Sequence, residues 1–128
     1  MATTQREMTS GPDTAPAAPC DDLVRLLEKG VFLSMDRYPG REGRPGWQQR
    51  NQTVKALIDR GYADKLMLGH DYGPRAVLAG EEPAPEEPTR YLFLTNTAIP
   101  ALREMGVSED TIRTMTVDVP RRFLTGEA

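Results

Sequence analysis

The chain has 128 residues, which is enough for one domain. Its 16 basic and 19 acidic side chains give a net charge of -3, and the scattered lysines and arginines form no basic patch of the kind that binds nucleic acid. One cysteine and one histidine cannot build an internal disulfide or a zinc finger, and no apolar run approaches the roughly 20 residues of a membrane span. We therefore expect a soluble cytoplasmic protein that binds neither nucleic acid nor a membrane.

Residues 1–19 are predicted to be a disordered leader, and residues 20–126 the structured part. The leader is rich in Ala, Pro and Thr, so it buries too little apolar surface to offset the entropy of ordering. A first helix is expected to begin at Asp21 or Asp22, because aspartate is a common N-cap, and to end at Gly30. Its apolar side chains recur at helical spacing: Leu23, Leu26 and Leu27.

Two short apolar segments, residues 31–35 and 65–69, are predicted to be strands buried on both faces. A second helix over residues 47–60 separates them and ends at Gly61. Strands that alternate with helices imply parallel β-α-β units, so the predicted fold class is α/β. Two parallel strands do not make a stable sheet by themselves, so the core is expected to be incomplete.

Three helical pieces are predicted after the second strand. Residues 97–105 form the first, which tolerates Pro100 only in its first turn. Ser108 caps the second, which extends to about Met115, and residues 120–124 form a separate last turn. Arg121 and Arg122 are expected to anchor the C-terminus.

Asp71 is the most informative polar residue, because it stands at the C-terminal tip of the second strand. Parallel α/β proteins gather their chemistry at these ends, where a carboxylate can bind a metal or act as a base; it can equally cap the turn. Asp36 and Arg37 follow the first strand and either line the same cleft or form a solvated pair. Because neighbouring strand residues face opposite sides, His70 is expected to have a structural role and not to share an ion with Asp71.

Four separated segments carry a family resemblance. They are GVFLSMDR at 30–37, RGYADKLMLGHD at 60–71, IPALREMGV at 99–107 and VDVPRRFL at 117–124. In this order they resemble the end of the phosphotriesterase family of metal-dependent hydrolases, over about residues 21–126. Val119 departs from the Asn that usually precedes the proline of the terminal motif, which removes a cap but no chemistry.

The resemblance implies a partial TIM (β/α)8 barrel, in which the two strands are the seventh and the eighth. It also implies a centre of divalent metal ions, with zinc the expected metal, that hydrolyses phosphotriester, lactone or ester bonds. Asp71 matches the carboxylate that ligates one metal and takes a proton from the bridging hydroxide. Arg37 and Tyr72 match positions that shape the substrate pocket.

The family's remaining ligands are a His-x-His pair, a modified lysine and two further histidines, on strands that this sequence lacks. A whole barrel needs about 250 residues. We therefore expect a C-terminal fragment that is inactive and binds metal weakly by itself. The alternative is a binding or assembly module, or a split-barrel half that completes a site with another chain through exposed barrel edges. A small metal-free enzyme is disfavoured because no nucleophile–base pair is visible.

Overall fold

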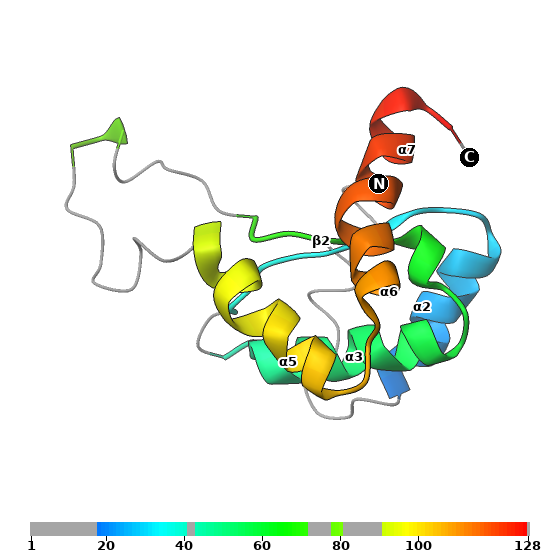
Figure 1. Cartoon of the computed structure of the whole chain (residues 1–128), viewed down its shortest axis with the longest axis horizontal. Coiled ribbons are helices and arrows are strands. Elements are labelled where there is room, and N and C mark those ends of the chain that lie inside the picture. Colours follow the sequence, from blue (N-terminus) through cyan, green and yellow to red (C-terminus); the bar gives the residue numbers. More distant parts are fainter. Residues whose placement is uncertain (1–17, 41–42, 72–77, 81–90, 128) are drawn as a thin grey trace.

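A computed structural model of the chain describes residues 18–40, 43–71, 78–80 and 91–127 (Figure 1). Residues 1–17 of the predicted leader lie outside this described part. The elements follow in the order α2 (Ala18–Glu28), β1 (Leu33–Met35), α3 (Trp47–Asp59), η1 (Ala63–Lys65), β2 (Leu66–Leu68), η3 (Leu94–Ala98), α5 (Ile99–Glu104), α6 (Glu109–Arg113), η4 (Thr114–Asp118) and α7 (Val119–Thr125). None of the helices in the described ranges has the length and apolar character that crossing a membrane requires.

The two predicted strands form a parallel pair, with Leu33 opposite Leu66 and Met67 opposite Ser34. Both are shorter than predicted, and β2 begins one residue later because residues 63–65 form a 3-10 turn. The prediction that both faces are buried is wrong for the described residues. Leu33 and Leu66 are fully buried, whereas Ser34 and Met67, on the other face, are only half-buried. The described helices therefore cover one face of the sheet.

The core lies between the covered face of this sheet and the surrounding helices. Figure 1 shows α6 and α7 running across the strands, while α3 and α5 lie along the lower side of the view. Helices α2, α3, α5 and α6 and the turn η4 all contribute apolar side chains to one cluster. Its buried members are Leu23, Leu27, Leu33, Met35, Val54, Leu57, Leu66, Leu102, Val107, Ile112 and Met115.

Helix α2 begins at Ala18, three residues before the predicted start. Cys20 extends its buried face upstream, because it stands three residues before Leu23 and seven before Leu27, on one helical stripe. Asp21 consequently lies inside the first turn, where its carboxylate faces the positive end of the helix dipole, and it does not cap the helix.

Two predicted helix boundaries after β2 are wrong. The helix expected from residue 97 is already helical from residue 91, and no break precedes Pro120, since α6, η4 and α7 run on continuously. Both differences arise from π-helical turns, in which Ile99 N donates to Leu94 O and Val119 N donates to Thr114 O. Each widened turn precedes a proline by one residue, so it makes room for a ring that would otherwise strike a carbonyl of the preceding turn.

The remaining helix capping signals are confirmed. Gly61 and Gly106 follow the helix ends with φ values of 90° and 94°, a left-handed conformation that glycine adopts without steric cost. Ser108 caps α6 by accepting a hydrogen bond from Thr111 N at 3.2 Å. Pro100 stands at the second position of α5, but because η3 precedes α5 without a break, it does not lie in the first turn of the whole helical run.

Arg122 anchors α7 to the amino end of β2, as predicted, by donating to the carbonyl of Asp64. The Phe123 ring meets the Phe32 ring edge-on at 6.1 Å, so the terminal helix also packs beside the start of β1. Arg121 pairs within its own helical run, with Asp118 at 3.2 Å. The predicted anchor is therefore Arg122 together with Phe123.

Candidate functional site

The structure brings Arg37 and Asp71 together beyond the carboxyl ends of β1 and β2. Arg37 Nε donates to Asp71 Oδ2 at 3.3 Å. The two side chains are 36% and 55% exposed, so water screens their attraction and the pair itself stabilises the fold little. A charged pair that is accessible and contributes little to stability is suited to meeting a ligand.

Both residues of this pair have left-handed backbone conformations, with φ of 64° at Arg37 and 51° at Asp71. For residues other than glycine this conformation costs about 1–2 kcal/mol each. Such strain persists only where the surrounding structure imposes it, and it concentrates at functional sites. The left-handed backbone thus sets the directions of the Arg37 and Asp71 side chains, and contacts with neighbouring residues must hold that backbone in place.

Asp36 lies buried beside the pair, with 3% of its surface exposed. Its Oδ1 atom receives no hydrogen bond from any residue in the described ranges. Burial and the negative charge of Asp71 raise the pKa of Asp36 to about 6, although Arg37 and Arg50 oppose the shift. The sequence left two alternatives for Asp36 and Arg37, a cleft shared with Asp71 or a solvated pair, and the burial of Asp36 contradicts the solvated pair.

His70 contacts the helical residues that follow β2. Its Nε2 atom accepts a hydrogen bond from Leu94 N at 3.1 Å, and its ring lies edge-on to Tyr91 at 6.3 Å. Burial lowers the pKa of His70, so the imidazole is neutral at pH 7 and can act as this acceptor. These contacts agree with the structural role expected for His70.

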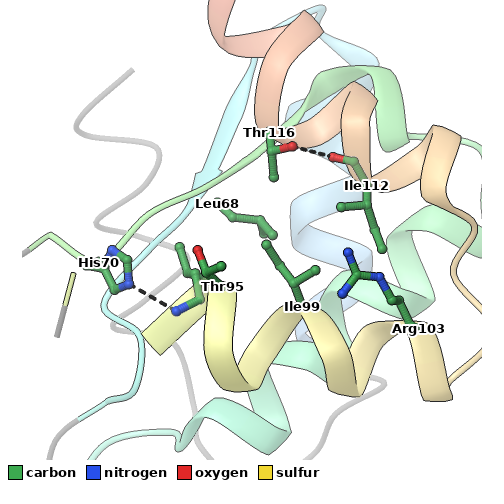
Figure 2. A pocket seen from close by; sticks show the side chains of 8 residues that line it. Leu68, His70, Thr95, Ile99, Arg103, Ile112 and Thr116 are labelled. Atoms are coloured by element: carbon green, nitrogen blue, oxygen red, sulfur yellow. Dashed lines mark hydrogen bonds between the residues drawn. The ribbon is translucent and has the colours of Figure 1, made fainter. Parts of the chain in front are cut away.

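A pocket of about 450 Å³ lies between β2 and the helices that follow it (Figure 2). Its lining residues are Leu68, His70, Leu94, Thr95, Ile99, Arg103, Ile112 and Thr116. Figure 2 shows His70 and Arg103 at opposite ends. Arg103 is paired with Glu109, and the Thr116 hydroxyl donates to Ile112 O. Since neither Arg37 nor Asp71 lines it, this pocket of mixed polar and apolar character is separate from the charged site.

The residues that the structure describes offer few metal ligands. They contain no group of three or more His, Cys, Asp or Glu side chains able to surround one. Catalytic zinc usually takes about three protein ligands, whereas this edge of the sheet offers the carboxylates of Asp36 and Asp71, one of them buried and the other paired with Arg37. Tyr72, predicted to contact substrate, lies outside the described residues.

Comparisons with known proteins agree on one family. A family model described as the phosphotriesterase family matches residues 13–124. The chain is 37% identical over 103 residues to a phosphotriesterase homology protein of Mycobacterium tuberculosis, covering 79% of this chain and 31% of that protein. It is 32% identical over 111 residues to an aryldialkylphosphatase of Saccharolobus solfataricus, covering 82% of this chain and 34% of the relative.

Solved structures also match most of this chain but only about a third of their own length. The phosphotriesterase from Mycobacterium tuberculosis matches with a TM-score of 0.64 and 32% identity, over 84% of this chain and 33% of that one. A mutant of an organophosphorus hydrolase from Deinococcus radiodurans matches with a TM-score of 0.66 and 27% identity, over 86% and 35%. The chain thus spans about a third of the length of the relatives that it matches.

Proposed function

Because the chain belongs to the phosphotriesterase family, we propose that residues 20–126 supply the last two β-α units of a barrel hydrolase that acts on phosphotriester, lactone or ester bonds. The observation that carries this proposal is the meeting of Arg37 and Asp71 beyond the carboxyl ends of two parallel strands. Barrel enzymes place their catalytic groups at this end of the sheet.

Asp71 contributes one carboxylate ligand to the metal centre that the family implies. The chemistry that a divalent metal, with zinc the expected one, would supply when bound in the complete site is activation of water and polarisation of the bond to be cleaved. The described residues supply too few ligands for such a centre, so we assign this chain one ligand position and no metal-dependent step. The other ligands belong to the strands that the sequence lacks.

Arg37 and Tyr72 shape the substrate pocket. The Arg37 guanidinium is one-third exposed beside Asp71, so it can donate a hydrogen bond to a phosphoryl or carbonyl oxygen placed near that carboxylate. Arg37 would therefore orient the substrate, while Asp71 belongs to the metal centre.

The chain by itself is proposed to be inactive and to complete its sheet with further strands. Ser34 and Met67 form a half-buried face of a parallel pair, whereas parallel sheets are normally covered on both faces. The same observation favours the alternative, an assembly module that docks on another chain through its open sheet edges.

A chimera tests the proposed function. Residues 21–126 replace the last third of the Mycobacterium tuberculosis homologue, and the purified protein is loaded with zinc and assayed with a phosphotriester and a lactone. We expect hydrolysis, and a loss of about 100-fold or more in Asp71→Asn, which removes the charge at constant shape. Asp59→Asn, on the exposed surface of α3, is the matched control and should leave the rate unchanged.

The outcomes separate the alternatives. A folded chimera that keeps its activity in Asp71→Asn contradicts the role of Asp71. A folded but inactive chimera favours the assembly module. Hydrolysis by the 128-residue chain alone would show that its site is complete.

A further inference from the structure

A buried chain of hydrogen bonds joins three elements next to the charged pair. Tyr38 Oη donates to Asn51 Oδ1 at 2.9 Å, and Asn51 Nδ2 donates to Ala98 O at 3.0 Å. Tyr38, Asn51 and Ala98 are 2%, 1% and 0% exposed. A buried polar group that loses its partner is costly, so these bonds fix the segment after β1 against α3 and η3.

Arg37 is held between two buried neighbours. Asp36 and Tyr38 are both almost fully buried, and the Tyr38 side chain is fixed through Asn51, whereas the Arg37 side chain reaches solvent. This arrangement keeps the Arg37 backbone in its left-handed conformation. The direction of the Arg37 guanidinium therefore depends on Tyr38, the fixed residue that follows it in sequence.

Asp71 is held in a corresponding way by η3, the turn that also contains Ala98. Leu94 N donates to His70 Nε2, and His70 directly precedes Asp71, which is the second left-handed residue. Leu94 and Ala98 are the first and last residues of η3. One π-helical turn thus holds a sequence neighbour of each member of the ion pair.

We propose that η3 is a positioning clamp, in which Asn51 and Tyr38 orient Arg37 while His70 orients Asp71, so that the guanidinium and the carboxylate meet in a fixed geometry. Asn51, Tyr38 and His70 are positioning residues, because each acts through a neighbour. The clamp deepens the proposed function, since it rests on Arg37 and Asp71 being the site residues.

Local order at Arg37 tests the clamp on the 128-residue chain itself. The NMR order parameter of the Arg37 Nε–H group is measured in ¹⁵N-labelled protein, and its signal is assigned by its loss in Arg37→Lys. We expect a value above about 0.6 in the parent chain, falling below it in Tyr38→Phe and in Asn51→Ala. Asp71→Asn should lower it as well, because the signal reports the contact with that carboxylate.

A matched control distinguishes positioning from stability. Leu23→Ala creates a cavity in the core under α2 and should lower the thermal midpoint at least as much as Tyr38→Phe, while the Arg37 signal stays ordered. Equal order parameters in Tyr38→Phe and the parent overturn the proposal, and so does an equal loss in Leu23→Ala. If Asn51→Ala fails to fold, the order parameter of Arg37 in Tyr38→Phe alone tests the proposal. Because no activity is measured, this test fails or succeeds independently of the chimera.

Discussion

At the amino ends of β1 and β2, aromatic rings and cations pack together, whereas charged side chains stand on strained backbone at the carboxyl ends. Phe32, just before β1, meets Phe123 edge-on at 6.1 Å. Lys65 Nζ lies 4.8 Å and Arg122 Cζ 5.7 Å from the centre of the Phe32 ring. Each cation is attracted by the face of the ring, so these ring contacts stabilise the fold, although Arg122 Nε is buried without a hydrogen-bond partner among the described residues.

The carboxyl ends show the opposite balance. Arg37 and Asp71 have left-handed backbone, and Asp36 is buried with an oxygen that no described residue satisfies. Each of these features lowers stability. The comparison teaches that the two ends of one short sheet differ: ring and cation contacts that stabilise the fold lie at the amino end, and strained or buried charged residues lie at the carboxyl end, where we propose the site. Barrel enzymes divide their two faces in the same way.

Truncating the aromatic ring at the amino end should have the largest effect. Phe32→Ala removes the contact with Phe123 and both cation–ring contacts, so we expect a loss of about 2–3 kcal/mol in the free energy of unfolding. Urea denaturation measures it. Leu124→Ala, on the same terminal helix but 81% exposed, should stay within about 0.5 kcal/mol of the parent. Equal urea midpoints for Phe32→Ala and the parent would contradict the contrast between the two ends.

Removing the buried charge at the other end should increase stability. The pKa of Asp36 in the folded chain is about 6, against an ordinary value of 3.8, so the folded state binds the proton more tightly than the unfolded state. The stability contributed by this proton is complete below about pH 4 and is lost as the pH rises through 6. Asp36→Asn should therefore be more stable than the parent at pH 7, by roughly 1–2 kcal/mol, and equal to it near pH 4.

Urea midpoints measured from pH 4 to pH 8 test this dependence. The exposed Asp22→Asn is the control, and its pH profile should follow the parent. If the urea midpoints of the parent and of Asp36→Asn changed in parallel with pH, the folded state would not raise the pKa of Asp36.

The smallest expected effect comes from relieving one strained residue. Arg37→Gly should raise stability by about 0.5 kcal/mol, because relief of the left-handed strain exceeds the entropy that glycine adds to the unfolded chain. The same change at Arg25, on the exposed side of α2, should lower stability by about 1 kcal/mol, because glycine is a poor helix former. Thermal unfolding compares the two variants, and equal signs would contradict the idea of strain at the site.

The sequence predicted the elements whose signals are local. The apolar runs that became β1 and β2 and the cap at Ser108 depend on residues within a few positions of one another. The π-helical turns were missed because the periodicity of a helix barely changes when one turn widens. The early start of α2 was missed, although Cys20 shares a helical stripe with Leu23 and Leu27, because the start was assigned to an aspartate cap.

The site was predicted only in part, because only some of its residues carry a local signal in the sequence. The rule that polar residues gather at strand ends pointed to Asp71 and Arg37, which the structure brings together. Their roles remain predictions, since no chemistry has been measured. Asn51 escaped notice because its partners lie 13 and 47 residues away, and no local pattern marks a buried amide in the middle of a helix.

The two π-helical turns also limit how this sequence can change by insertion or deletion. Each turn holds one residue more than an α-helical register would need, and each is followed by a proline at the second position of the next helix. Deleting a residue from 94–98 would restore the tighter register and drive the ring of Pro100 against a backbone carbonyl. Residues 114–118 and Pro120 are linked in the same way. In this family, the extra residue and the proline should therefore be gained or lost together.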